Sequence, residues 1–503
     1  MTTNILTQFI RSTEAKLVIV KGVGYSATNF GVSGKQGHAQ KNEIGVTMSD
    51  TPTHQWTSNY VFLMAAIGSA VGLANIWKFP YTVGTQGGGA FILIYLLAVF
   101  VIAVPILIAE LAIGRSGRRG PATSIEQVAL ASGASKNWKH IAFFGILASI
   151  LALSFYFTIS GWAVFYTLES LRGSFVDVQG ADFQRIYDDF TQSPSELISY
   201  MTGFALMTAI PVGLGVTNGI ERFVKSVMPV FFVLLIFTCG VAMLHGDLSA
   251  TVDFMFRFDF EAITGQTILY AIGQAFFSVG VGACVLIVFG SYLPRNVSIV
   301  KSAFIIASVD TLIALLSGLT IFPIVFAQGL DPGEGPGLMF VALPAALSTF
   351  YMGSVLATLF FTMLLLAALT SAIAIALPPI EWLKARFSLS HIVATTLVFS
   401  FEWLLAITVA LSFNEWSDFY PLEFIPLFRD LTFFGIYEMV AANIAMPLGG
   451  VLLSLFVGWG MSSSILREEL NLKSDRSVIL WRGVFRYLIP LALLGMATAS
   501  FSR

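Results

Sequence analysis

Residues 56–81 read WTSNYVFLMAAIGSAVGLANIWKFPY, and this apolar stretch decides the fold. A membrane helix needs about 20 apolar residues to cross a hydrocarbon layer of roughly 30 Å, and the stretch has that length. Its centre, GSAVGLAN at residues 68–75, is a poor helix interior because glycine, serine and asparagine favour unwinding. Unwound backbone at bilayer depth is costly unless its polar groups bind something. The stretch therefore predicts a broken membrane helix with a binding site at the break.

A second interpretation of the same small residues stays open at this point. Gly, Ala and Ser also allow neighbouring membrane helices to approach closely. A packing face would need no unwinding and no ligand. The stretch alone does not decide between a break and a packing face.

The composition predicts a polytopic membrane protein. The chain has 503 residues, of which 56% are hydrophobic and 11% charged, whereas soluble domains carry about 25% charged residues. A net charge of −2 leaves no basic surplus for nucleic acid. The two cysteines, Cys239 and Cys284, lie in apolar runs and indicate no disulfide framework.

The chain contains eleven candidate spans. Residues 1–55 are polar and predict a flexible cytoplasmic tail, without the apolar core of a secretory signal. Met48, close to the first span, is an alternative translation start to Met1. After the first span, the candidates are residues 87–115, 141–171, 198–216, 219–245, 266–292, 299–327, 351–386, 390–412, 432–460 and 480–500. Residues 338–348, between two of them, predict a short re-entrant helix.

The basic residues of the loops predict the orientation. One alternate set of loops is rich in Arg and Lys; these residues lie at 115–139, 222–225, 295–301, 384–386 and 467–482. The opposite set has Arg172, Arg185, Arg257 and Arg429 and is acidic. Because basic loops stay in the cytoplasm, we expect a cytoplasmic amino terminus and, with an odd number of spans, an outside carboxyl terminus.

The sixth candidate span is also interrupted. Residues 266–292 read QTILYAIGQAFFSVGVGACVLIVFGSY, with small residues at 278–283. Broken helices at the start of two five-helix halves are typical of an inverted repeat whose binding site lies where the breaks meet. We therefore divide the chain into a tail, two repeats, and a cytoplasmic loop with an eleventh helix; the bounds are 1–55, 56–245, 246–460 and 461–503. If the small residues served only for packing, two packing faces would have to occur by chance at matching positions of the two halves.

Polar residues inside other spans agree with a binding site. Glu110 and Asp310 are intramembrane carboxyl groups, which are costly and mark functional pathways by default. We expect Glu110 to satisfy loose backbone near the breaks and Asp310 to supply charge. Thr370 and Ser371 place two hydroxyl groups in an aliphatic run; their alternative role is to bond carbonyl groups one turn back.

Four motifs together resemble the neurotransmitter:sodium symporter family, and its bacterial amino-acid transporter branch in particular. They are GSAVGLANIWKFPY with GGGAF close behind (68–91), NGIERFVKSVMP (218–229), GQAFFSVGVG (273–282) and LTSAIAI (369–375). The similarity extends from Trp56 to the tenth span. It implies an all-α polytopic protein with a five-plus-five inverted repeat, broken spans one and six, and a place in the bacterial inner (plasma) membrane.

The resemblance implies two Na⁺ sites. Matched residue by residue, the first uses the Ala70 carbonyl, Asn75, Ser278 and Asp310, completed by the carboxylate of the substrate. The second uses the carbonyls of Gly68, Val71 and Ala367 and the hydroxyls of Thr370 and Ser371. Asp310 stands where chloride-dependent relatives have asparagine, and Ala314 replaces their hydroxyl ligand, so we expect chloride-independent transport.

The resemblance also implies a substrate pocket for an α-amino acid. Its residues are Ser69, Ala70, Gly72, Leu73, Ala74, Tyr156, Phe277, Ser278, Gly280, Ala283, Ser371 and Ile375. Monoamine carriers have aspartate at Gly72, whereas glycine leaves room for the carboxylate of the substrate. The small Gly280 and Ala283 favour a hydrophobic or aromatic side chain.

The predicted gates include one departure from the family. Lys78 and Glu438 replace the arginine and aspartate of the outer gate, which keeps an ion pair but loses bidentate geometry. Thr53 and Ala385 stand where the inner gate has an arginine and an aspartate, so that ion pair is absent. Other contacts, with Trp56 and Tyr292 available, must hold the inner gate, unless the matching slips in the tail.

The function we expect is sodium-driven amino-acid symport by alternating access. A proton-coupled transporter of the same fold is an alternative because Glu110 and Asp310 are titratable. An ion channel would need a carbonyl-rich filter or a ring of charge, neither of which the sequence has. A receptor that binds an amino acid without moving it is a further alternative. The sequence has no pattern of a catalytic nucleophile, metal cluster or phosphate loop, so we expect no enzyme.

Overall fold

The structure is a computed structural model that describes residues 55–175, 178, 180–333, 337–350 and 353–501. The chain divides into two units, Met1–Thr51 and Pro52–Arg503. The first unit, with most of the predicted tail and Met48, lies outside the described residues. Within the described part of the second unit all regular elements are helical and no strand occurs, which confirms the all-α prediction.

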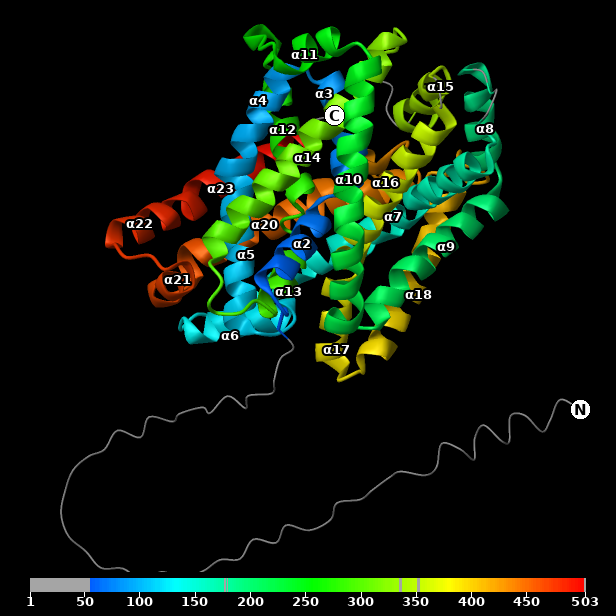
Figure 1. The fold of residues 1–503 in the computed structure, drawn as a ribbon. Helices are drawn as coiled ribbons and strands as arrows, with labels where there is room; N and C mark the ends of the chain where they lie inside the picture. The colour runs from blue at the N-terminus through cyan, green and yellow to red at the C-terminus, as the bar shows by residue number, and fades with distance from the viewer. Residues whose placement is uncertain (1–54, 176–177, 179, 334–336, 351–352, 502–503) are drawn as a thin grey trace, which may run out of the picture. The chain divides into compact units, whose positions relative to one another are not determined.

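The first half of the described chain contains nine α-helices, α2 to α10, with short 3-10 or π-helical segments, labelled η, between some of them (Figure 1). In order they are α2 (Asn59–Ala70), η1 (Ala74–Lys78), α3 (Phe79–Thr85), α4 (Gly89–Ala98), η2 (Val99–Ala103), α5 (Val104–Gly117), α6 (Pro121–Ala131), η3 (Lys136–His140), α7 (Ile141–Arg172), α8 (Gly180–Gln192), α9 (Pro194–Gly213), η4 (Val216–Ile220) and α10 (Glu221–His245).

The second half continues in the same manner. Its elements are α11 (Leu248–Phe256), η5 (Phe260–Ala262), α12 (Gly265–Val279), α13 (Val285–Ser291), α14 (Ile299–Ala327), η6 (Leu338–Ala342), α15 (Leu343–Ser348), α16 (Gly353–Ile375), α17 (Leu377–Phe387), α18 (His391–Leu411), η7 (Pro426–Phe428), α19 (Phe433–Glu438), η8 (Met439–Ala445), α20 (Met446–Leu455), η9 (Phe456–Gly460), α21 (Ser463–Leu470), α22 (Asp475–Gly483), η10 (Val484–Leu488) and α23 (Ile489–Phe501). The re-entrant helix predicted at 338–348 is η6 with α15.

The predicted count of eleven spans is not confirmed. Among the described residues, nine helices are long and apolar enough to cross a membrane, and ten if the bent pair Asn59–Ala70 and Ala74–Thr85 counts as one span. The stretch 266–292 forms α12 and α13, which are separated by residues 280–284 and are each too short to span alone. The broken sixth span is thus the reason for the lower count.

The first span breaks at residues 71–73. Val71 is extended, with φ −76° and ψ 111°, and its N–H donates to the Ile67 carbonyl as the last bond of α2. The chain then turns by 51° into the second half of the span. The Gly72 carbonyl accepts from the N–H groups of Asn75 and Ile76 at 3.2 and 3.3 Å, which starts the new helix.

Gly68 shows that the small residues also provide a packing face, beside the break. It stays inside α2, and a Cβ atom there would lie 2.9 Å from the Met228 sulfur and 3.2 Å from Thr370 Cβ. Its lack of a side chain therefore allows α10 and α16 to pack against α2, while the break itself lies three residues later.

The sixth span breaks through a run of left-handed residues. Gly280, Gly282 and Cys284 have φ of 70°, 87° and 62°, a region that glycine adopts without strain. The buried Glu110 on α5 accepts a hydrogen bond of 2.8 Å from the N–H of Gly282. Glu110 thus satisfies backbone at the break, as its predicted structural role requires.

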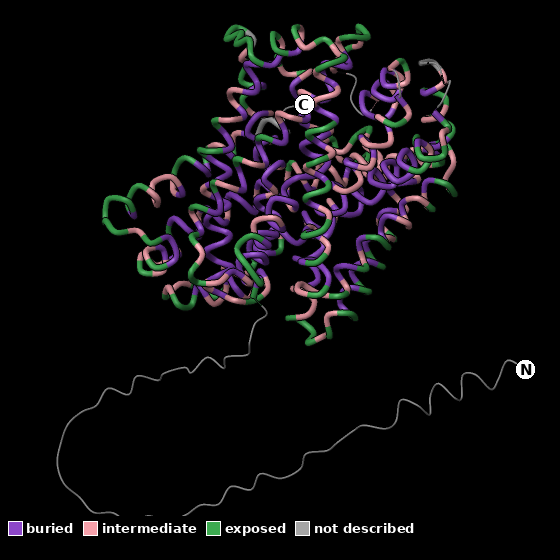
Figure 2. Tube along the Cα trace, viewed as in Figure 1, coloured by how far each residue is buried: buried purple, intermediate pink, exposed green. Residues whose placement is uncertain are grey.

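The two breaks lie in the middle of a helical bundle. Helices α2, α10 and α14 pack on one another in the centre, with α22 and α23 on one side and α9 and α18 on the other (Figure 1). Figure 2 shows that the buried residues concentrate in this centre. On its outer face α10 exposes Ile236 (65%) and Leu244 (81%), an apolar surface that is expected to contact lipid.

The bundle has two ends, which we name by their loops. The basic end carries α6, α13 and α17, and the acidic end carries α3, α11 and α15 (lower and upper parts of Figure 1). The break at 71–73 joins α2 to η1 and α3 of the acidic end, and the break at 280–284 joins α12 to α13 of the basic end.

Candidate functional site

Three polar side chains from three elements meet at the breaks. Asn75 begins the second half of the first span, Ser278 lies near the end of α12, and Asp310 lies in the middle of α14. The Asn75 amide nitrogen donates to Asp310 Oδ1 at 2.8 Å and to Ser278 Oγ at 3.2 Å. Ser278 Oγ donates to Asp310 Oδ2 at 2.7 Å. All three side chains are buried, so the structure brings together three of the four predicted ligands of the first Na⁺ site.

This cluster has an unused oxygen that fits a cation. The buried Asn75 Oδ1 has no hydrogen-bond donor within the described part of the chain. An unpaired acceptor of this kind costs free energy unless it binds a ligand. Together with the Asp310 carboxyl group it forms an oxygen-only donor set, which suits a hard cation. Ala70, the fourth predicted ligand, is the last residue of α2 and directly precedes the break.

The residues of the second predicted Na⁺ site lie where α2 faces α16. Gly68 approaches Thr370, as described above. Thr370 Oγ1 donates to the Ala367 carbonyl at 3.0 Å, which is the one-turn bond of the alternative interpretation. Ser371 Oγ instead donates across to the Ser69 carbonyl on α2 at 3.3 Å. Val71, at the break, is the remaining member. The structure thus brings Gly68, Thr370 and Ala367 together, although the Thr370 hydroxyl proton is used within its own helix.

One part of the predicted substrate pocket is assembled around Gly72. A Cβ atom at Gly72 would lie 2.6 Å from the Tyr156 hydroxyl oxygen and 2.9 Å from Ser371 Oγ. The Leu73 N–H donates to the same Tyr156 oxygen at 3.2 Å. Only glycine therefore fits at this position while Tyr156 holds the unwound backbone.

The other predicted pocket residues lie near the two breaks or at the end of α16. The Ala74 carbonyl accepts from Gln274 Nε2 at 3.1 Å, and the Ala283 carbonyl accepts from Ser149 Oγ at 2.9 Å. Gly280 ends α12. Ile375 lies at the end of α16, four residues after Ser371 and therefore on the same helix face.

Sequence reasoning missed two residues of the cluster. The buried Tyr95 donates its hydroxyl proton to Ser278 Oγ at 3.3 Å, and Gln274 holds the Ala74 carbonyl. Gln274 lies inside the quoted GQAFF motif, so its amide in an apolar span was an available signal. Tyr95 lies in an apolar run in which its hydroxyl group gives no distinctive pattern.

The predicted outer gate residues form an ion pair. Lys78 Nζ lies 3.1 Å from Glu438 Oε1, with side chains 34% and 40% exposed. The same Nζ lies 4.5 Å from the ring centroid of Phe277. Pairs that are this exposed contribute about 1 kcal/mol or less. The contact is therefore weak enough to break readily.

At the basic end, hydrogen bonds join Trp56 to the end of α13, and the end of α13 to α17. The indole N–H of the buried Trp56 donates to the Phe289 carbonyl at 3.1 Å, and its backbone N–H donates to the Tyr292 carbonyl at 3.2 Å. The Tyr292 hydroxyl donates to Glu381 on α17 at 3.3 Å. Of the missing ion pair, Thr53 lies outside the described residues and Ala385 is exposed.

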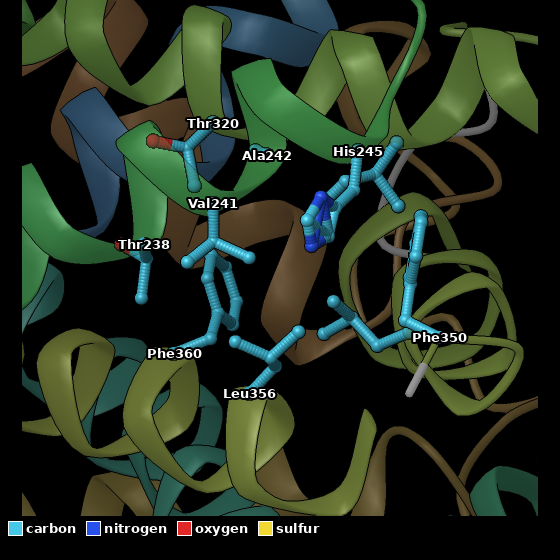
Figure 3. Close-up of a pocket in the computed structure, with 10 residues that line it drawn as sticks. Thr238, Val241, Ala242, His245, Thr320, Phe350, Leu356 and Phe360 are labelled. Carbon is cyan, nitrogen blue, oxygen red and sulfur yellow. The ribbon is translucent and has the colours of Figure 1, made fainter. Parts of the chain in front are cut away.

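A separate small pocket lies away from these residues. It lies among α10, α14, α15 and α16, has a volume of about 20 Å³, and has an almost wholly apolar lining (Figure 3). Its labelled residues are Thr238, Val241, Ala242, His245, Thr320, Phe350, Leu356 and Phe360. It contains none of the predicted site residues and is too small for an amino acid.

The broken helices and the polar cluster between them define a polytopic membrane transporter. The family model of the sodium:neurotransmitter symporter family matches residues 53–179 and 181–502, and the chain belongs to that family. It is thus a transporter and not an enzyme.

Relatives and a solved structure agree with this assignment. The chain is 34% identical to the sodium-dependent transporter YhdH of Bacillus subtilis, over 89% of this chain and 97% of the relative. It is 30% identical to a sodium-dependent transporter of Haemophilus influenzae, over 89% and 98%. The crystal structure of MhsT in complex with L-phenylalanine superposes with a TM-score of 0.81 at 34% identity, covering 89% of this chain and all of MhsT. This similarity confirms the predicted fold.

Proposed function

We propose that this protein is a secondary active transporter that couples Na⁺ entry to uptake of an α-amino acid by alternating access. The observation that carries the proposal is the buried cluster of Asn75, Ser278 and Asp310 at the two breaks, with an unused amide oxygen. The sodium-dependent relatives named above support the choice of ion.

The substrate we propose is a hydrophobic or aromatic amino acid. Gly72 excludes the acidic side chain that an amine substrate would require, because Tyr156 and Ser371 fill the space beside it. The Tyr156 hydroxyl group, which accepts from the Leu73 N–H at the amino end of a half-helix, would bind the carboxylate. The phenylalanine in the MhsT structure supports an apolar side chain.

The ion binding we propose involves two Na⁺ ions as co-transported substrates. Asn75, Ser278, Asp310 and the Ala70 carbonyl would hold one, and Thr370, Ser371 and the carbonyls of Gly68, Val71 and Ala367 the other. At a membrane potential of about 100 mV each ion gains about 2.3 kcal/mol, and a tenfold gradient adds about 1.4 kcal/mol. Two ions would therefore supply about 7 kcal/mol for accumulation.

Chloride independence is part of the proposal. Asp310 provides a carboxyl group beside the first site, and Ala314, one turn later, provides no hydroxyl ligand for an anion. Uptake by purified protein in liposomes should therefore continue when chloride is replaced by gluconate. A sharp fall in uptake would contradict this part and leave the sodium coupling to be judged separately.

The proposed orientation places the basic end in the cytoplasm of a bacterial inner membrane. The amino terminus would then be inside and the carboxyl terminus outside, with residues 56–245 and 246–460 as the two repeats. Because the Lys78–Glu438 pair and the Trp56 contacts are both formed, we assign the structure to an occluded state. Rocking of spans one, two, six and seven would open it to the inside.

A thermal-shift screen of the twenty amino acids in sodium or potassium buffer tests the proposal. A ligand that binds only the folded protein raises the melting temperature. We expect at least one apolar amino acid to raise it in sodium and not in potassium. No sodium-dependent shift with any amino acid would contradict the proposed function.

Proton coupling remains the second candidate because of one observation. The buried Glu110 Oε2 has no hydrogen-bond partner within the described residues. This oxygen is therefore free to carry a proton. Uptake in sodium-free buffer driven by a pH gradient would favour this candidate over sodium symport.

A further inference from the structure

Two adjacent residues at the amino end of α2 bind different parts of the bundle. Trp56 binds the end of α13 through the carbonyls of Phe289 and Tyr292, as described above. Thr57 binds Glu221, the first residue of α10. The first contact joins two spans of the proposed moving group, whereas the second joins that group to α10.

The contact between Thr57 and Glu221 uses both carboxyl oxygens. The backbone N–H of Thr57 donates to Oε1 at 3.1 Å, and its hydroxyl donates to Oε2 at 2.7 Å. Glu221 is only 5% exposed although Thr57 itself is exposed. Hydrogen bonds to a buried charged acceptor are stronger than those between neutral groups. The amino end of α2 is thus held at two points by one side chain.

We propose that Glu221 is the residue that closes the inner gate in this chain, acting through Thr57. This proposal rests on the proposed alternating-access function. The contact between Thr57 and Glu221 takes the place of the ion pair that is absent at Thr53 and Ala385. Glu221 is a positioning residue, because it touches no predicted ligand of sodium or substrate.

Inward opening requires this contact to break. If spans one and six move together, Trp56 keeps its bonds to α13 while α2 separates from α10. Both hydrogen bonds of Thr57 are then lost. The free energy of this contact therefore sets the balance between the closed and the inward-open states.

The same contact is linked to the second predicted Na⁺ site. Met228, two turns after Glu221 on α10, contacts α2 at Gly68, a predicted carbonyl ligand. Helix α10 therefore supports α2 from its amino end up to this site. When the inner gate opens more readily, a smaller fraction of the protein is competent to bind sodium, and the apparent affinity falls by that fraction.

A purely structural role is the alternative. Glu221 lies in the first turn of α10, where a carboxyl group stabilises the helix through its dipole. That role does not involve Thr57. It predicts a lower melting temperature for Glu221 variants and no effect of the Thr57 hydroxyl on sodium binding.

The test uses the full-length protein with Thr57→Val, Thr57→Ser, Glu221→Ala and the double variant Thr57→Val/Glu221→Ala. Thr57→Val removes the hydroxyl at nearly constant volume, and Thr57→Ser keeps it. Ser226→Ala is the matched control, because the Ser226 hydroxyl donates only within α10, to the Arg222 carbonyl. Two quantities are measured: hydrogen exchange of the amides at 56–62, and the sodium concentration that half-protects them.

We expect Thr57→Val to raise exchange at 56–62 by about tenfold. The half-protecting sodium concentration should rise by up to the same factor. Thr57→Ser and Ser226→Ala should match the wild type, and the double variant should match Glu221→Ala. Unchanged exchange and sodium dependence in Thr57→Val, or additive effects in the double variant, would overturn the proposal.

The exchange experiment is independent of transport. If the wild-type protein accumulates no amino acid in sodium, the proposed function fails. The comparison of exchange between wild type and variants still decides whether Glu221 holds the amino end of α2.

Discussion

Asn75 is the residue whose contacts give the clearest evidence for the binding site. Its amide nitrogen is used by Ser278 and Asp310, and its oxygen is left for a ligand. Asn75→Ala should therefore abolish the sodium-dependent rise in melting temperature that an amino acid produces. Asn137→Ala, at an exposed asparagine, is the control and should leave that rise intact. Persistence of sodium-dependent binding in Asn75→Ala would remove this residue from the site.

Gly72 permits a second prediction at the scale of single residues. Because its Cβ would meet the Tyr156 hydroxyl oxygen at 2.6 Å, Gly72→Ala should weaken amino-acid binding by about tenfold or more and cost about 1–3 kcal/mol of stability. Tyr156→Phe in the Gly72→Ala background removes the clashing atom and should restore part of the stability. Gly203→Ala, on α9, meets no heavy atom within 4 Å and should be neutral. Calorimetry and melting temperatures decide the outcome.

The sequence predicted the members of the site better than their bonds. Asn75 and Ser278 lie in motifs that matched a known family, Asp310 stood out as an intramembrane carboxyl group, and the structure places the three within hydrogen-bond distance. The donation of the Thr370 hydroxyl to Ala367 and of Ser371 to the Ser69 carbonyl depends on rotamers and on the distance between two helices. Neither quantity can be read from residue spacing.

At the scale of the helix, substitutions of Glu110 test what stabilises the unwound segment of the sixth span. Glu110→Gln retains an oxygen for the Gly282 N–H, whereas Glu110→Leu leaves that N–H without its acceptor. We expect Glu110→Leu to cost about 1–3 kcal/mol and Glu110→Gln much less, measured as melting temperatures. The pair also separates the two candidate functions. Sodium-driven uptake should survive Glu110→Gln, and its loss would favour Glu110 as a proton carrier.

The positions of the helices were predictable from the sequence, but the residues at which the first span breaks were not. Residues 299–327 form α14 over the predicted range because the run is long and predominantly apolar. In the first span the small residues spread over 68–75, and the break occurs at 71–73. Gly68 stays helical, and Met228 and Thr370 pack against it. Such contacts with other helices are not visible in the local sequence.

At the scale of the whole molecule, the two sodium clusters predict the coupling ratio. Proteoliposomes of the full-length protein are brought to equilibrium with an amino acid identified by the thermal-shift screen, at fixed membrane potential. If one Na⁺ enters with each amino acid, a tenfold rise in outside sodium raises the accumulation ratio about tenfold; if two enter, it rises about a hundredfold. We expect the larger change.

The variants distinguish which cluster contributes each ion. Thr370→Ala with Ser371→Ala removes both hydroxyl groups of the second cluster and leaves the bonds of Asn75 and Asp310 in place. The first cluster alone would then give a change of about tenfold, provided the variant still transports. A change of about tenfold in the wild type would contradict two-ion coupling, because the free energy of one ion cannot support the larger ratio at equilibrium.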